Sequence, residues 1–322
     1  YREDGVLVRI RARSFYVEDY HTLQFTVSSA LANYPYPSGY NEPMWLYFAI
    51  GAGLLFTCST LLNRRLLKTG SDPWVLSFYF SAIGAVISLP FMLSNFKAPD
   101  TWSLWLVMLL TACLVVFHNF LNYTALKHIS ASVHGTFYKL RLVWVFLIGI
   151  FLALESWQAL TVLGVALTVA AGVLLVWKKG ERFSMTGVAF VIGSSLVNAI
   201  AFTLFKFLFG SFNVETLTFL TFFIPAIINA LVIPKFPQRV KEFGSKNWLV
   251  IVTACSFGAF ANLAINTAIN LGQVTSVLVI VEVFLILVLA GEHLFLKERA
   301  GMLKKTVAVL LAVIGAICIL IR

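Results

Sequence analysis

The sequence predicts an all-α membrane protein with ten transmembrane helices in two inverted five-helix repeats, preceded by a short extramembranous N-terminal tail. Its 322 residues are 60% hydrophobic and only 12% charged, about half the charged fraction of an ordinary soluble domain. From Met44 onward, apolar runs of about 20 residues, the length that crosses a bilayer, follow one another. Similar polar motifs also recur about 143 residues apart.

The first 43 residues differ in composition from the rest of the chain. Val6, Val8 and Ile10 alternate weakly with basic residues, which is typical of a β-hairpin or an extended arm. The segment ends in the turn-rich stretch at 34–39. We expect residues 1–43 to lie outside the membrane, and the sequence assigns them no function.

The remaining chain divides into a first repeat, residues 44–180, and a second repeat, residues 181–322. Short connections such as Leu154–Ser156 and Leu271–Gln273 make consecutive helices antiparallel neighbours. Small residues inside the spans, such as Gly164 and Gly315, permit close helix packing. The expected spans are 44–66, 73–94, 102–125, 131–154, 157–177, 184–209, 214–234, 247–270, 274–296 and 301–321.

The two halves are related by an internal repeat. A shift of 143 residues lays HNFLNYTAL (118–126) on ANLAINTAI (261–269) and pairs Asn119 with Asn262. A shift one residue smaller pairs Gly51 with Gly193. Because five spans is an odd number, the second copy has to cross the membrane in the opposite sense. Inverted repeats of this kind are the usual basis of alternating access.

Composition and motifs also exclude several classes of protein. The four cysteines are scattered singly in apolar runs, which indicates small buried side chains and no metal site. The net charge of +10 comes from Lys and Arg in the connections between spans, which set membrane orientation and do not indicate nucleic-acid binding. No Walker A, HExxH or GxSxG motif occurs, so we expect no catalytic residues, no cofactor and no direct use of ATP.

Several stretches together resemble the drug/metabolite transporter superfamily in its EamA-type ten-helix form. They are TALKHISAS (124–132), TVLGVALTVAAGVLLVW (161–177), TAINLGQVTSVLVIVE (267–282) and LFLKERAG (294–301). The resemblance implies a basket of ten helices with a central cavity lined by spans 1, 3, 4, 6, 8 and 9. It departs at FYKLRLV (137–143), where many family members have apolar residues around a proline. Within this stretch, Leu140-Arg141-Leu142 is faintly similar to the Leu-Lys-Ile stretch of nucleotide-sugar transporters. It does not fix the substrate.

Two arguments about orientation disagree. Lys and Arg fall almost entirely in the connections after odd-numbered spans, which places those connections in the cytoplasm and both termini outside it. The resemblance instead implies termini on the cytoplasmic side. Both orientations stay open at this stage.

Charged residues inside the spans are the first candidates for function, because each is costly to insert and usually faces a cavity or a partner. Arg141 follows His134 and Tyr138 at helical spacing, and this polar stripe predicts a substrate-binding surface in span four. Lys139 and Glu282 are equivalent under the 143-residue shift and predict an interdomain ion pair or a coupling site. Lys206 lies near the end of its span, where its amine can reach the membrane surface.

Four amides add matching polar patches to spans three and eight. They either bind substrate or hydrogen-bond between helices. Trp144, inside span four, either lines the cavity or faces lipid. The four amides are Asn119, Asn122, Asn262 and Asn266.

These features predict a secondary active transporter of a small anionic or zwitterionic metabolite, such as an amino acid or a phosphorylated or carboxylate compound. The alternatives are an exporter of lipophilic cations and drugs, or a non-transporting membrane scaffold. The expected partners are a small-molecule substrate and membrane lipids, with no nucleic acid; a coupling proton, the oligomeric state and the transport direction stay open. We expect a cell membrane of the bacterial inner type, with an organellar membrane as the alternative.

Overall fold

The computed structural model describes residues 44–68, 72–99, 101–151, 159–176, 184–209, 211–271, 274–291, 293–294 and 302–320. All of the regular secondary structure in these ranges is helical, which confirms the all-α class. The predicted tail at 1–43 lies outside the described residues, as do the connections 152–158 and 177–183.

The helices follow the expected spans closely. Six of those described, α2, α3, α4, α8, α9 and the part of α10 from Trp248, are long and apolar enough to cross a membrane. The first half contains α2 (Met44–Lys68), α3 (Pro73–Ser94), α4 (Trp102–His128), α5 (Ala131–Tyr138), α6 (Leu140–Phe151) and α7 (Ala159–Val176). The second half contains α8 (Met185–Leu208), α9 (Val214–Val232), α10 (Phe236–Leu271), α11 (Val274–Val283), α12 (Leu285–Gly291) and α13 (Met302–Leu320).

The fourth span of each half is interrupted, contrary to the continuous helices expected over 131–154 and 274–296. The first interruption is at Lys139, between α5 and α6, and the second is at Phe284, between α11 and α12. At both sites the backbone forms shorter-range hydrogen bonds, such as Leu142 N–H to Lys139 O at 2.9 Å. The carbonyl of Phe284 also accepts a hydrogen bond from the Thr57 hydroxyl at 3.4 Å. Interrupted backbone of this kind is tolerated where other groups satisfy it.

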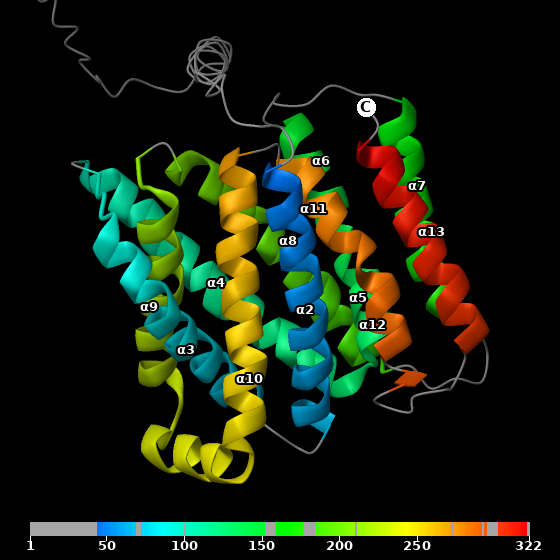
Figure 1. The fold of residues 1–322 in the computed structure, drawn as a ribbon. Coiled ribbons are helices and arrows are strands. Elements are labelled where there is room, and N and C mark those ends of the chain that lie inside the picture. Colours follow the sequence, from blue (N-terminus) through cyan, green and yellow to red (C-terminus); the bar gives the residue numbers. More distant parts are fainter. Residues whose placement is uncertain are drawn as a thin grey trace, which may run out of the picture.

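The connection expected at 235–246 is instead the first part of α10. Pro237 suits the first turn of a helix, where its missing N–H costs nothing. This part lies across the lower end of the bundle in Figure 1. It is fixed to α3, because Tyr79 stacks on Phe243 and donates a hydrogen bond to the carbonyl of Val240 at 2.9 Å. An ion pair between Arg239 and Asp72 adds to this contact.

The most extensive helix contacts join the two halves of the chain. α2 packs along α10, α4 along α8, α3 along α9, and α7 along α13. Figure 1 shows α2 and α10 side by side in the middle of the view, and α7 and α13 together at its right-hand edge. In the order of the two halves, α2 corresponds to α8, α3 to α9, α4 to α10 and α7 to α13. Replacing each helix by its equivalent therefore converts the α2–α10 pair into the α8–α4 pair, and it leaves the α3–α9 and α7–α13 pairs unchanged. The halves therefore interlock and do not form separate bundles.

Small side chains and interhelical hydrogen bonds hold these pairs together. Ser59 on α2 donates to the carbonyl of Ala254 on α10 at 2.9 Å. Asn229 on α9 donates to Ser77 on α3 at 3.2 Å. Between α7 and α13 the backbones come very close at Gly315. Close approach and polar bonds of this kind are how helices associate in lipid, where the hydrophobic effect gives no drive.

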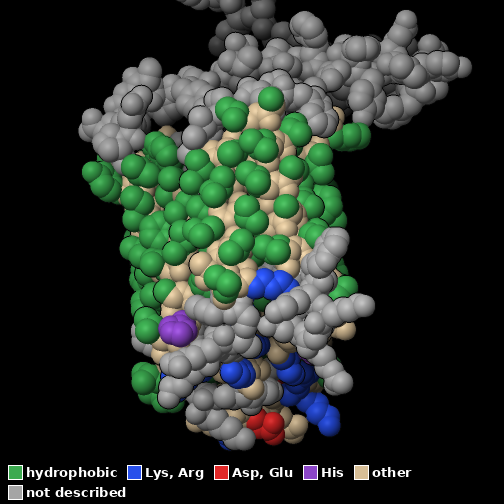
Figure 2. Space-filling view, turned by 90° about the vertical axis from the view of Figure 1, so that its right-hand side faces the viewer, with side chains coloured by type: hydrophobic (Ala, Val, Ile, Leu, Met, Phe, Trp, Pro, Cys, Tyr) green, Lys and Arg blue, Asp and Glu red, His purple; other side chains and the backbone are tan. Residues whose placement is uncertain are grey.

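The outer surface has the polarity of a membrane protein. Figure 2 shows hydrophobic side chains covering most of one face and Lys and Arg side chains gathered at its lower end. Exposed apolar residues on α7 and α13 contribute to this band, among them Leu163, Leu310 and Ile314. The segregation of an apolar band from a basic end is the arrangement that a bilayer and its interface require.

The contact between α7 and α13 leads to a stability prediction. A methyl group added at Gly315 would lie 2.7 Å from both the carbonyl oxygen of Gly164 and the hydroxyl of Thr168. Gly315→Ala should therefore lower the free energy of unfolding by about 1–3 kcal/mol. Gly51→Ala is the matched control, because nothing lies within 4 Å of that added carbon. Thermal unfolding of the purified variants in detergent checks both, and equal melting temperatures would contradict this packing.

Candidate functional site

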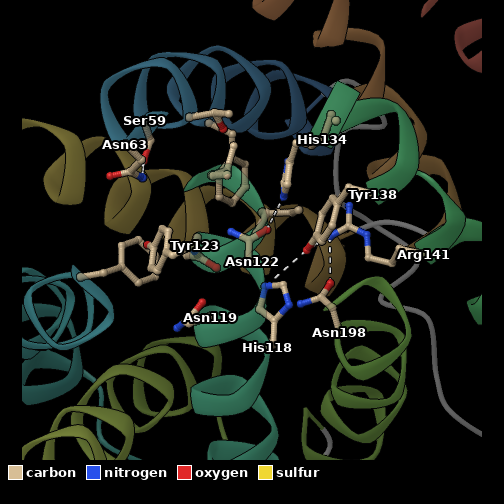
Figure 3. A pocket seen from close by; sticks show the side chains of 18 of the residues that line it. Ser59, Asn63, His118, Asn119, Asn122, Tyr123, His134, Tyr138, Arg141 and Asn198 are labelled. Carbon is tan, nitrogen blue, oxygen red and sulfur yellow. Dashed lines mark hydrogen bonds between the residues drawn. The ribbon is translucent and has the colours of Figure 1, made fainter. Parts of the chain in front are cut away.

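A central cavity of about 210 Å³ lies between the two halves. Helices α2 to α6 supply one part of its wall and α8 to α12 the other. Figure 3 shows the polar side chains of α4, α5, α6 and α8 converging on it. The polar lining residues are Thr57, Ser59, Thr60, Asn63, His118, Asn119, Asn122, Tyr123, His134, Tyr138, Arg141, Asn198, Thr221, Asn262 and Asn266.

Arg141 carries the one formal charge among the described residues of this lining. It stands in the first turn of α6, directly after the interruption at Lys139, and is only 5% exposed. Its Nη1 donates to Asn198 Oδ1 at 3.0 Å and lies 3.5 Å from Tyr138 Oη. The guanidinium carbon lies 4.9 Å from the ring centre of Tyr138 and 5.2 Å from that of Phe202. Aromatic faces and an amide oxygen thus stabilise the buried cation.

His118 links Tyr138 to α8. Its Nε2 lies 3.4 Å from Tyr138 Oη, and its Nδ1 lies 2.9 Å from Ser194 Oγ and 3.1 Å from the Ser194 carbonyl. The roles of donor and acceptor depend on the imidazole tautomer. A continuous polar chain therefore runs from Ser194 through His118 and Tyr138 to Arg141 and Asn198. It joins α4, α5, α6 and α8 around one side of the cavity (Figure 3).

His134 and the two amides of α4 form a second polar group beside this chain. His134 stacks on Tyr138 with ring centres 5.6 Å apart, and its Nε2 lies 2.8 Å from Asn122 Oδ1. Within the described residues, the buried Nδ2 of Asn119 and Nδ1 of His134 have no hydrogen-bond partner. Buried polar atoms are nearly always satisfied. These two atoms are therefore available to a polar group that enters the cavity.

The amides of α10 have structural partners. Asn266 donates to Thr218 on α9 at 2.9 Å, and Asn262 donates to the carbonyl of Gly258 within its own helix at 2.9 Å. Both still line the cavity. Their hydrogen bonds support the packing interpretation. Asn119 and Asn122 instead belong to what we call the polar wall, which also contains His118, His134, Tyr138, Arg141, Ser194 and Asn198.

Seven of the predicted binding residues thus come together around one cavity: Arg141, Tyr138, His134, Asn119, Asn122, Asn262 and Asn266. Trp144 does not line it, and its Nε1 donates to Ser195 Oγ at 3.1 Å. Lys139 is fully buried and is not part of the lining. The side chains of Glu282 and Lys206 lie outside the described residues, so the predicted pair of Lys139 with Glu282 stays a prediction.

Sequence reasoning missed Asn198 and Ser194. Asn198 is a lone amide inside an apolar span, without the matching amide in the other half that singled out Asn119. Its partner, Arg141, is 57 residues away in the chain.

Comparison with known proteins now adds the family. A model of the EamA-like transporter family matches the chain twice, over residues 43–177 and 185–321. No curated protein matches the chain. Among solved structures 28 chains match. One, described only as "Crystal structure of protein", has 17% identity and a TM-score of 0.56, over 84% of this chain and 94% of its own. That likeness concerns the fold alone. The two family matches together cover most of the sequence, and the chain therefore belongs to the EamA-like transporter family, as an integral multi-pass membrane transporter of the drug/metabolite type.

Proposed function

We propose that the protein is a secondary active transporter that moves a small anionic or zwitterionic metabolite by alternating access. Its repeats would be residues 44–180 and 181–322, each with five membrane crossings if α5 with α6, and α11 with α12, count as one crossing each. Consecutive helices reverse direction in Figure 1, so the second half begins in the opposite sense to the first. The pairing of helices across the halves supports such an inverted repeat.

The buried guanidinium of Arg141 is the observation that carries the substrate class. It is a fork of donors that matches carboxylate and phosphate geometry. It lines the cavity at 5% exposure, where the low dielectric strengthens its attraction for an anion. The Nδ2 donor of Asn119, which has no hydrogen-bond partner within the described residues, is available to the same ligand. An anion that enters this cavity gains a charge-assisted contact, which the described residues of the lining do not offer to a cation.

Export of lipophilic cations is the second candidate, because aromatic rings line much of the cavity and attract cations through their faces. The geometry around Arg141 argues against a cationic substrate at the polar wall. Arg141 already lies over the rings of Tyr138 and Phe202, and a second cation beside it would be repelled. A scaffold without transport activity gives no account of a polar cavity between the halves.

We propose the bacterial inner membrane as the location of the protein.

Replacing Arg141 tests the proposed anion site. Arg141→Gln should lower exchange of the transported anion by at least about tenfold, because charge-assisted hydrogen bonds contribute about 1.5–3 kcal/mol each. Arg141→Lys keeps the charge but not the planar fork of donors, so its rate of exchange should lie between that of the unchanged protein and that of Arg141→Gln. The measurement is counterflow into proteoliposomes with labelled amino acids, carboxylates and sugar phosphates.

Arg65→Gln is the matched control, because Arg65 is an exposed arginine at the end of α2 outside the cavity. It should exchange the same anions as the unchanged protein. Wild-type exchange of every anion by a folded Arg141→Gln protein would show that this residue does not bind the substrate.

We further propose that Lys139 and Glu282 form an ion pair between the halves. Lys139 closes α5 with a fully buried side chain, and Glu282 lies in α11 two residues before the second interruption. α5 packs against α12, which follows that interruption. The equivalence of the two positions under the 143-residue shift places them at matching depths in opposite repeats.

A charge exchange tests this pair. Lys139→Met and Glu282→Met should each lower stability by about 3–5 kcal/mol, because the remaining partner is left as a buried charge. The double variant Lys139→Glu with Glu282→Lys should recover most of that loss. Thermal unfolding and counterflow are measured on all four proteins, and a double variant no better than the singles would rule out the pair.

A further inference from the structure

The polar wall of the cavity has a largely apolar counterpart under the internal repeat. Under the 143-residue shift, Arg141 corresponds to Phe284, and under the shift one residue smaller, Asn198 corresponds to Phe56. The hydrogen-bonded pair, which takes one residue from each half, is thus matched by two phenylalanines, and both line the same cavity. Asn122, His134 and Tyr138 also have apolar equivalents, Ile265, Val277 and Val281, whereas Asn119 corresponds to Asn262.

Aromatic rings form a second surface of the cavity, the aromatic wall, made by Phe80, Phe222 and Tyr123. Phe80 meets Phe222 edge-on at 5.4 Å and Tyr123 at 6.3 Å between ring centres. Glycines seat these rings: a carbon added at Gly84 would lie 2.4 Å from the ring of Phe222, and one at Gly258 would lie 2.5 Å from that of Phe80. The rings therefore hold fixed positions against the helix backbones.

The aromatic wall and the cation lie on opposite sides of the cavity. Figure 3 shows Tyr123 at one end of the lining and Arg141 at the other, with the amides of α4 between them. A cavity of about 150 Å³ accommodates benzene. The volume of about 210 Å³ leaves room for a ring and one compact head group.

We propose that the substrate is an organic monoanion with an apolar body about the size of one ring. Its anionic head lies against Arg141, and its body lies against Phe80 and Phe222. This proposal rests on the anion transport proposed above and narrows it.

Three probes separate the head from the body. Benzenesulfonate has both, methanesulfonate has the head with hardly any body, and benzenesulfonamide has the ring with a neutral head at pH 7. Isothermal titration of the purified full chain in detergent gives the dissociation constants. Benzenesulfonate should bind at least about tenfold more tightly than either of the others, since burial of a ring contributes a factor of this size or more.

Two adjacent phenylalanines test where the apolar body of the ligand binds. Phe222 is 4% exposed in the cavity wall, whereas its neighbour Phe223 is 44% exposed on the outside of α9. Phe222→Leu should weaken benzenesulfonate binding by at least about threefold and leave methanesulfonate unchanged, because the leucine buries less apolar area. Phe223→Leu should change neither.

The outcomes distinguish the two proposals. Equal binding of methanesulfonate and benzenesulfonate, both lost in Arg141→Gln, would overturn the apolar body and leave the anion site standing. Benzenesulfonate binding that survives Arg141→Gln unchanged would overturn the anion site itself. Failure of all three probes to bind would overturn the proposed substrate class. The comparison of probes on the unchanged protein needs no variant to fold.

Discussion

A guanidinium buried in the middle of an apolar bundle is the constraint on which the rest of the site depends. Arg141 requires polar and aromatic partners, since an unstabilised charge at this depth would be expelled. Its partners come from two other elements: Asn198 and Phe202 from α8 and Tyr138 from α5. His118 and Ser194 then fix Tyr138 to α4 and α8. The position of one cation therefore determines how four helical segments meet.

The interrupted helices and the cavity are two aspects of one arrangement. An uninterrupted span four would continue the helix through Lys139, whereas the interruption lets α6 begin next to the cavity with Arg141 in its first turn. Backbone that leaves the helical pattern inside a membrane requires other partners. Thr57 supplies one for Phe284 in the second half. Such interruptions are therefore expected beside a polar cavity and not on the lipid face.

Much of the fold could be predicted because spans are long apolar runs and the polar stripe of His134, Tyr138 and Arg141 follows helical spacing. The interruption at Lys139 could not, since that position holds neither proline nor glycine. The first turns of α10 were hidden because their apolar residues are few among basic ones. The roles of Trp144 and Asn198 could not be predicted either, because they depend on hydrogen bonds between α6 and α8 that only the packing of these helices forms.

The two halves share their frame but differ in their lining. Helices pair across the halves in a pattern that survives exchange of the halves, so positions at these contacts serve equivalent purposes in both. Positions that face the cavity are not constrained in this way, and equivalent positions differ there: Arg141 corresponds to Phe284, and Asn198 corresponds to Phe56. A frame with matching halves can adopt two mirrored conformations at similar free energy. In the proposed mechanism of alternating access, the unequal lining would keep the ligand in one orientation in both conformations, because its charge would face Arg141 in each.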